Sequence, residues 1–136
     1  MKKPRNPFAK EEEELPPDIV YLEDRSLHGW LDKQSKKGGI FSSWKRVFVT
    51  VEHLKLRYYK DQKQNYQKGV IDFTRIKSQL SVIDDRTFKI SVQVKGGSYK
   101  DFVFRTMRDG NLGTWMSFIS LNLSNPTIDF FSETKS

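Results

Sequence analysis

The sequence has 136 residues and a mass of 16.0 kDa, a length that favours one domain with a modest core. Hydrophobic residues make up 36% of it and charged residues 30%, and no apolar run approaches the ~20 residues that a transmembrane helix requires. The sequence contains no cysteine, which excludes disulfides, thiolate metal sites and cysteine nucleophiles. The N-terminus lacks the apolar stretch of a secretory signal, so we expect a cytoplasmic protein.

The net charge of +7 is concentrated in one part of the sequence. Residues 29–68 carry ten basic and three acidic side chains, whereas the rest of the chain carries 14 of each. Positive charge concentrated in this way favours an anionic partner, which can be a membrane, a phosphate ligand or a nucleic acid. An ordinary solvated surface is the alternative.

Proline and charge patterns divide the chain into four parts. Residues 1–18 combine a basic, proline-broken start with a run of glutamates, and we expect a flexible charged tail there. The remaining parts are a lead-in segment at residues 19–27, the domain itself at 28–124 and a C-terminal tail at 125–136.

Seven short runs of aromatic and β-branched residues are separated by turn-forming residues, as in consecutive antiparallel strands. We expect these strands at residues 28–33, 44–51, 54–59, 70–73, 80–83, 88–94 and 99–106. Side chains alternate between the two faces of a strand, so Leu31 and Lys33 share a face of the first run. By the same alternation, Lys45 and Val47 share a face of the second run and Arg46 lies on the other.

The last expected element has a different period. Apolar residues recur three and four positions apart between residues 112 and 123, which predicts an amphipathic helix. Asp109 is its expected N-cap, and Asn125-Pro126 is expected to end it. Gly110 and Gly113 weaken the first turn, so packing of Trp115 must supply much of the helix's stability.

Three local patterns resemble the pleckstrin-homology (PH) domain family. They are the opening Gly29-Trp30-Leu31-x-Lys33, the run Trp44-Lys45-Arg46 that enters the second strand, and the helix tryptophan Trp115. The resemblance covers about residues 28–123. It implies a mainly β fold, a strongly bent seven-stranded antiparallel barrel, or orthogonal sandwich, capped at one end by a C-terminal α-helix. The loops after the first, third and sixth strands surround the other end, where lipid-binding members hold phosphoinositide headgroups.

The resemblance also implies a headgroup site. Lys33 matches the lysine that ends the first strand in phosphoinositide-binding members, and Lys45 matches the start of a basic pair in the second. Val47 stands where an arginine is expected, which disfavours tight trisphosphate binding because that guanidinium is a bidentate phosphate ligand. The expected headgroup-binding residues are Lys33, Lys36, Lys37, Lys45, Arg57 and Tyr59.

Two bulky apolar residues, Ile40 and Phe41, lie between Gly38-Gly39 and Ser42-Ser43 in the loop after the first strand. We expect them to insert into the boundary between headgroups and acyl chains, beside the lysines of the same loop. The alternative is that Phe41 folds back over the rim of the barrel.

Other classes of function have weaker support in the sequence. It contains no nucleophile motif, no metal-ligand spacing and no glycine-rich loop that opens a helix, so we expect no enzyme, no catalytic residue, no metal and no cofactor. No motif for nucleic-acid binding is present, and the aromatic residues occupy expected core positions. We therefore expect a monomeric module that binds anionic phospholipid, phosphoinositide or phosphatidic acid, peripherally at a membrane. A protein-interaction adaptor of the same fold is the alternative.

Overall fold

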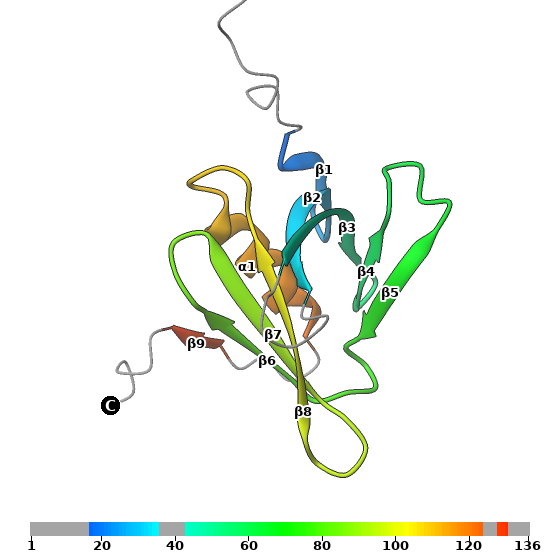
Figure 1. Ribbon diagram of the computed structural model, residues 1–136, viewed down its shortest axis with the longest axis vertical. Helices are drawn as coiled ribbons and strands as arrows, with labels where there is room; N and C mark the ends of the chain where they lie inside the picture. The colour runs from blue at the N-terminus through cyan, green and yellow to red at the C-terminus, as the bar shows by residue number, and fades with distance from the viewer. Residues whose placement is uncertain (1–16, 36–42, 124–127, 131–136) are drawn as a thin grey trace, which may run out of the picture.

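The computed structural model describes residues 17–35, 43–123 and 128–130. Within these residues the chain forms nine strands and one helix (Figure 1). The elements are β1 (Ile19–Glu23), β2 (Ser26–Ser35), β3 (Ser43–Glu52), β4 (Lys55–Tyr59), β5 (Gln67–Asp72), β6 (Ser78–Val82), β7 (Thr87–Gln93), β8 (Tyr99–Arg105), α1 (Leu112–Asn122) and β9 (Ile128–Phe130).

The strands form one bent sheet in the order β5-β4-β3-β2-β8-β7-β6-β9, with β1 paired to β2. All pairs are antiparallel except β6 with β9. The seven strands expected from the sequence correspond to β2–β8, and the C-terminal helix follows them, so the predicted fold class is confirmed. The sheet is not closed into a complete barrel, because β5 is an edge strand of the described sheet.

Strand β2 joins the two halves of the sheet. Its N-terminal part pairs with β1, and near its C-terminal end only Asp32 and Lys33 pair with β8, opposite Arg105 and Phe104. From Leu27 to Ser35 the other edge of β2 pairs with β3. The change of partner along one edge bends the sheet, and it puts Lys33 at the point where the two halves meet.

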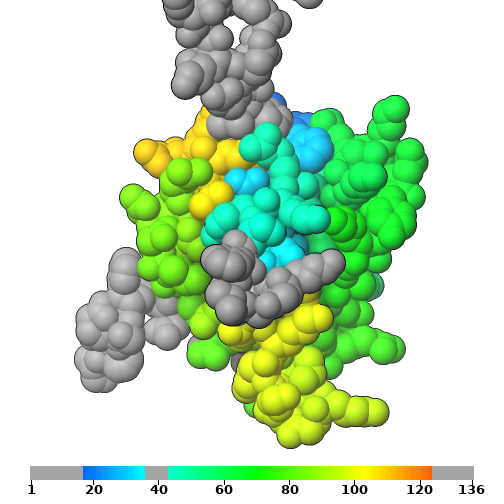
Figure 2. All heavy atoms as spheres, viewed as in Figure 1, coloured from blue at the N-terminus to red at the C-terminus, as the bar shows by residue number. Residues whose placement is uncertain are grey.

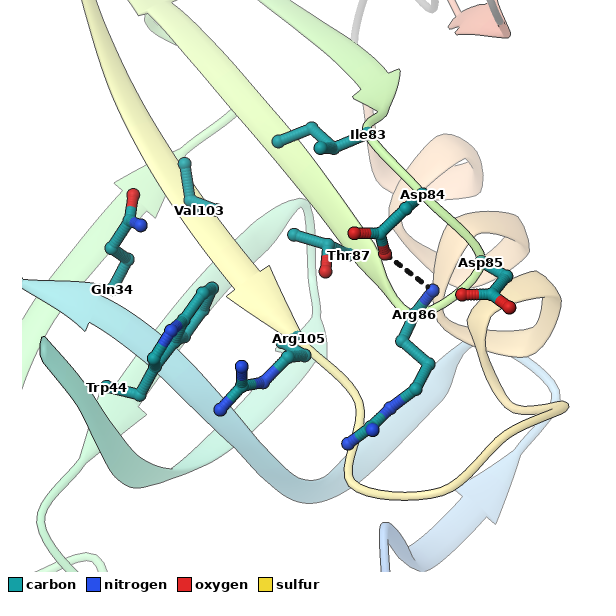
Figure 3. A pocket seen from close by; sticks show the side chains of 9 residues that line it. All are labelled: Gln34, Trp44, Ile83, Asp84, Asp85, Arg86, Thr87, Val103 and Arg105. Carbon is teal, nitrogen blue, oxygen red and sulfur yellow. Dashed lines mark hydrogen bonds between the residues drawn. The ribbon is translucent and has the colours of Figure 1, made fainter. Parts of the chain in front are cut away.

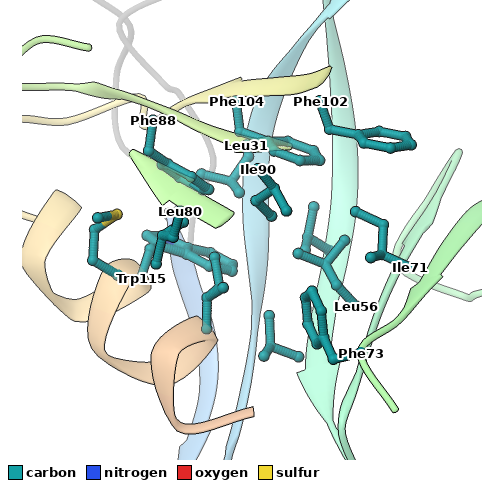
Figure 4. Close-up of a cluster of buried hydrophobic side chains, with 14 of the residues drawn as sticks. Leu31, Leu56, Ile71, Phe73, Leu80, Phe88, Ile90, Phe102, Phe104 and Trp115 are labelled. Carbon is teal, nitrogen blue, oxygen red and sulfur yellow. The ribbon is translucent and has the colours of Figure 1, made fainter. Parts of the chain in front are cut away.

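The core fills the concave side of the bent sheet and is closed at one end by α1. Trp115 is fully buried there, and Figure 4 shows its ring among core side chains that come from several strands. Phe88 and Phe104 stack at a centroid distance of 5.6 Å farther along the core. Packing of Trp115 therefore holds the helix against the sheet, as the sequence predicts.

Asp18 anchors the segment before β1 to the loop before α1. Its side chain is 1% exposed and accepts hydrogen bonds from the backbone N–H groups of Met107 (3.1 Å) and Arg108 (3.0 Å), and from Asn111 Nδ2 (2.8 Å). Its backbone carbonyl accepts a hydrogen bond from Trp30 (2.7 Å). Asp18, which the sequence assigns to a flexible tail, is therefore part of the packed structure.

Gly29 makes this close approach possible. A Cβ atom at this position would overlap the Asp18 carbonyl group and would lie 2.9 Å from Cζ2 of Trp115. The glycine that opens the family pattern thus has a steric reason, because only glycine leaves room for both the anchored N-terminal segment and the helix tryptophan.

The start of α1 differs from the prediction. The N-cap is Asn111 and not Asp109; the Asn111 side chain makes no capping hydrogen bond, and its Nδ2 donates to Asp18. Asp109 lies in the preceding loop, with Oδ1 3.9 Å from Nε of Arg86. The prediction for Asp109 was wrong because the sequence pattern of a cap does not reveal that the tertiary contact with Asp18 fixes this loop.

Candidate functional site

Lys33 and Lys45 lie directly opposite each other on β2 and β3. They line a cavity of about 260 Å³ on the concave side of these strands, together with Ser35, Val47, Tyr58 and Lys68. The register of β2 and β3 brings the two lysines together because Leu31 pairs with Val47 and each lysine is two residues from that pair, on the same face. The structure therefore places two of the sequence-predicted site residues in one pocket.

Tyr58 of β4 lines the pocket, whereas the sequence predicted its neighbour Tyr59 as a headgroup-binding residue. The Tyr58 ring centroid lies 5.2 Å from the Lys33 ammonium, and burial raises the pKa of its phenol. Gly69 pairs with Tyr58 on β5, and a side chain at Gly69 would overlap the Tyr58 ring. Glycine at this position thus lets the ring lie across the neighbouring strand and face the pocket.

Arg57 and Tyr59 both lie in the part of the chain that the structure describes, but they are not among the residues that line this pocket. Arg57 is adjacent to Tyr58 in β4 and therefore points to the opposite face. Tyr59 is 8% exposed and pairs with Phe48. The structure thus leaves these two predicted residues outside the cavity, and it replaces them with Tyr58 from the same strand.

Lys68 enters the pocket through an irregularity in β5. Tyr58 pairs with Gly69 and Tyr59 pairs with Gln67, so Lys68 is the extra residue of a β-bulge. A bulge changes the direction of a side chain without ending the strand pairing. Strand alternation in the sequence does not place Lys68 here, because it does not indicate the bulge.

Lys33 lies in a partly buried environment of like charge. Partial burial, followed by repulsion from Lys100 and Lys68, lowers the pKa of Lys33 below its ordinary value of 10.5. Within the described ranges, none of the recorded ion pairs involves Lys33, Lys45 or Lys68. Among the described residues, several cations thus converge without a recorded ion pair to a carboxylate, an arrangement that a bound phosphate would stabilise.

A second cavity, of about 450 Å³, adjoins the first and shares Lys33 and Ser35 with it. Its other walls come mainly from the start of β8, including Tyr99, Lys100 and Asp101. The ammonium groups of Lys33 and Lys100 lie 5.7 and 5.1 Å from the centroid of the Phe102 ring, so both cations contact the same aromatic ring. Asp101 accepts a hydrogen bond from the hydroxyl of Ser91 (2.7 Å).

The pocket contains no arginine side chain from β3, as the positions of Val47 and Arg46 show. Val47 is 1% exposed and lines the pocket at the position where the family pattern has an arginine. Arg46 lies on the convex face, with its Nε 3.6 Å from Oδ1 of Asp32, as the strand alternation predicts. No guanidinium of β3 therefore reaches the pocket, and its cations are ammonium groups.

A third cavity, of about 430 Å³, lies on the other side of β2 and β3 (Figure 3). Trp44 and Arg105 form one wall, where the guanidinium lies 4.0 Å from the tryptophan ring centroid. The turn between β6 and β7 forms the opposite wall, where a hydrogen bond from the backbone N–H of Arg86 lowers the pKa of Asp84 and keeps it ionised. Acidic and basic groups are thus mixed in this cavity, unlike in the Lys33–Lys45 pocket.

Several predicted site residues lie outside the described residues. These are Lys36, Lys37, Ile40 and Phe41. Within the described ranges, no cluster of histidine, aspartate and glutamate could hold a metal ion. The one described helix has 11 residues, so none of the described helices is long and apolar enough to cross a membrane.

Comparison with known proteins identifies the family. The model of the PH domain family matches residues 25–124. The chain belongs to the PH domain family. The mouse protein Arf-GAP with Rho-GAP domain, ANK repeat and PH domain-containing protein 2 is 30% identical over 104 residues, which cover 74% of this chain and 5% of that protein. The human protein 3 of the same description is 34% identical over 91 residues, 67% of this chain and 5% of that protein.

Solved structures share the fold of this PH domain. The N-terminal PH domain of human ARAP2 has a TM-score of 0.57 and 24% identity, with 86% of this chain and 90% of that chain covered. The Slm1 PH domain, solved in complex with D-myo-inositol-4-phosphate, has a TM-score of 0.57 and 14% identity, with 72% and 94% covered. The curated relatives are much longer proteins, because the chain spans about 5% of their length. PH domains are typically non-catalytic modules, within which the Lys33–Lys45 pocket is the candidate site.

Proposed function

We propose that this PH domain binds anionic phospholipid headgroups in the Lys33–Lys45 pocket and so attaches peripherally to a membrane. The observation that carries the proposal is the convergence of Lys33, Lys45 and Lys68 on one cavity, with a lowered pKa for Lys33. An anionic phosphate between these ammonium groups would relieve their mutual repulsion and make charge-assisted hydrogen bonds. Tyr58 offers a phenol at the same cavity as a hydrogen-bond partner for a headgroup hydroxyl.

The class of headgroup follows from the size and chemistry of the pocket. At about 260 Å³ it is slightly smaller than the ~300 Å³ of the smallest typical ligand pockets. With Val47 in place of an arginine, its floor offers no bidentate phosphate ligand. We therefore propose headgroups with one phosphomonoester, phosphatidic acid or a monophosphorylated inositide. The Slm1 PH domain, crystallised with inositol 4-phosphate, supports this choice by likeness of fold.

The loop after β2 is part of the proposal. Lys36 and Lys37 would add positive charge beside the pocket, and Ile40 and Phe41 would enter the headgroup–acyl boundary. If so, Phe41→Ala lowers affinity for vesicles and leaves affinity for a soluble headgroup unchanged. Equal loss for both ligands would show that Phe41 shapes the pocket, and no loss for either would remove it from the membrane contact.

A protein-interaction adaptor is the second candidate, and the Trp44–Arg105 cavity favours it. Its mixture of apolar walls, carboxylates and guanidinium groups suits a peptide segment better than a purely anionic ligand. The two candidates differ in the surface they use, since the lysine pocket and this cavity lie on opposite sides of β2 and β3.

Sedimentation of the chain with lipid vesicles tests the proposal. We expect binding to phosphatidylcholine vesicles that contain phosphatidic acid or phosphatidylinositol 4-phosphate, and little binding to phosphatidylcholine alone. At ~1 kcal/mol for each cation near an anionic surface, Lys33→Gln with Lys45→Gln should weaken binding at least about 30-fold. Lys55→Gln with Lys89→Gln is the matched control, because it removes the same charge away from the pocket. Equal binding to neutral and anionic vesicles, or equal effects of the two double variants, would refute the proposal.

A further inference from the structure

The outer edge of β6 differs from the other edges of the sheet. At the far end of the sheet β5 carries a bulge at Lys68, and β1 has an irregular register after Ile19. Bulges, charged side chains and prolines protect edge strands from pairing with other chains. β6 pairs with β7 without irregularity, and its sequence Ser78-Gln79-Leu80-Ser81-Val82 contains no charged residue and no proline. The β6 edge therefore lacks the usual protection.

Alternate backbone groups of β6 face away from β7. The N–H of Ile83 donates to the carbonyl of Thr87 (2.8 Å). The N–H of Gln93 donates to the carbonyl of Lys77 (2.9 Å). Both bonds continue the β6–β7 register, and hydrogen-bonded pairs alternate along antiparallel strands, so the odd-numbered residues of β6 bond to β7. The outer edge therefore presents the N–H and carbonyl groups of Ser78, Leu80 and Val82.

The C-terminal strand β9 shows that this edge accepts a strand. Residues 128–130 pair in parallel with residues 80–82, and Figure 1 shows β9 beside β6 at the side of the molecule away from β5. Within the described part of the chain, no strand pairs with Ser78 or Gln79 on this side. Short pairings are marginal and parallel pairings are slightly weaker than antiparallel ones. The edge can therefore hold a longer, antiparallel strand more tightly than it holds β9.

The neighbours of this edge indicate which side chains a partner strand would carry. Leu80 and Val82 share the core face of β6, and apolar partner residues aligned with them would lie on that face. Ser81 lies on the other face, opposite Lys89 of β7. Because the serine side chain is small, the lysine can reach across it to an acidic residue aligned with Ser81. Ile83, the next residue along the chain, is 50% exposed and offers a further apolar contact.

We propose that the outer edge of β6, residues 78–82, docks an extended segment of a partner protein that has an acidic residue between two apolar residues. The segment pairs with the sheet as an added strand and displaces β9, whose tethered pairing sets how tightly the partner binds. The β6–β7 and β4–β5 hairpins lie on opposite sides of the molecule (Figures 1 and 2), and β7 and β8 separate β6 from β2 in the sheet order. The proposal is therefore independent of the Lys33–Lys45 pocket, and the two sites can be occupied together.

The test measures binding of a fluorescent peptide to the full 136-residue chain by anisotropy. The peptide, Thr-Ile-Asp-Phe-Phe-Ser, repeats residues 127–132 and represents the partner strand. Asp129→Pro removes a backbone N–H from β9 and leaves β6 unchanged. Val82→Pro, added to this variant, removes an outward N–H of β6 and keeps the bonds to β7. Val82→Ala in the same background is the matched control, because it keeps that N–H.

Two further peptides of the same sequence test strand pairing without any change in the protein. One carries backbone N-methyl groups at its odd positions and the other at its even positions. The N–H groups of alternate residues in a strand face opposite edges, so one of these peptides loses the donors that face β6 and the other keeps them.

We expect the Asp129→Pro chain to bind the unmodified peptide about tenfold more tightly than the wild type, because an edge that β9 occupies about 90% of the time loses a factor of ten in apparent affinity. Amide chemical shifts at residues 78–82 should change on binding. We expect Val82→Pro to abolish binding and Val82→Ala to retain it, and we expect one of the two N-methylated peptides to bind and the other to fail.

The peptide's failure to bind the Asp129→Pro chain would overturn the proposal, and so would equal binding of the two N-methylated peptides. The peptide comparison decides the outcome even where Val82→Pro does not fold. Equal affinities of the wild type and the Asp129→Pro chain would overturn the displacement of β9. Shifts concentrated at residues 67–72 would make β5 the accepting edge, and dimerisation of the Asp129→Pro chain without peptide binding would make a second copy the occupant. Either result would overturn the proposal and leave the headgroup pocket intact.

Discussion

Asp18→Ala should destabilise the domain more than its position near the N-terminus suggests. The carboxylate is 1% exposed and accepts hydrogen bonds from Met107, Arg108 and Asn111. Each bond to a charged acceptor contributes about 1.5–3 kcal/mol, and alanine leaves three donors without this partner. The variant no longer has to desolvate a carboxylate, which offsets part of the loss. We expect the free energy of unfolding to fall by about 3–5 kcal/mol, a large share of the ~5–15 kcal/mol that stabilises a typical domain.

Chemical and thermal denaturation measure this loss. At ~4–8 °C per kcal/mol for a domain of this size, the midpoint temperature should fall by at least about 12 °C. Asp24→Ala removes an exposed carboxylate from the β1–β2 turn and should change stability by less than about 0.5 kcal/mol. A chain that begins at residue 25, where the family match begins, should lose at least as much as Asp18→Ala. An Asp18→Ala variant as stable as Asp24→Ala would refute the anchoring role.

The remaining predictions concern the helix and the pocket. Trp115→Ala should lower the free energy of unfolding by about 3–5 kcal/mol in denaturant titrations, because the fully buried ring closes the core, and an unchanged midpoint would refute that role. The lowered pKa of Lys33 means that, just below pH 10.5, the unfolded chain binds more protons than the folded one, so stability contributed by this group rises with pH. Lys33→Met, which keeps the apolar stem, should therefore be more stable than the wild type at neutral pH, by a margin that shrinks as the pH approaches 10.5. A margin independent of pH would show that burial of the charge is not its cause.

Strand alternation explains how much of the site the sequence could predict. The positions of Lys33 and Lys45 follow from period-two patterns in two strands whose pairing is fixed by apolar residues around them. The same rule puts Tyr58 on the core face with Leu56, so Tyr58 could have been found by asking which residue of the third strand shares the face of Lys33. Choosing Arg57 and Tyr59 gave more weight to charge and residue type than to the face.

The features that the sequence could not predict depend on contacts between distant segments. Lys68 reaches the pocket because a bulge in β5 changes its direction, and no local pattern indicates the bulge. Asp18 is buried because three donors about 90 residues away converge on it, which also displaces the expected N-cap of α1. Strand β9 pairs in parallel with β6, a long-range pairing that its three residues do not indicate.

The most direct test of the headgroup pocket is a titration of the isotope-labelled chain with soluble inositol 4-phosphate, followed by the chemical shifts of backbone amides. The structure predicts that saturable shifts concentrate at Lys33, Lys45, Tyr58 and Lys68, and that the turn at residues 83–87 beside the Trp44–Arg105 cavity stays unchanged. Lys33→Gln with Lys45→Gln should abolish the shifts, and Lys55→Gln with Lys89→Gln should leave them as in the wild type. Shifts that concentrate at residues 83–87, or that persist without Lys33 and Lys45, would contradict the headgroup pocket.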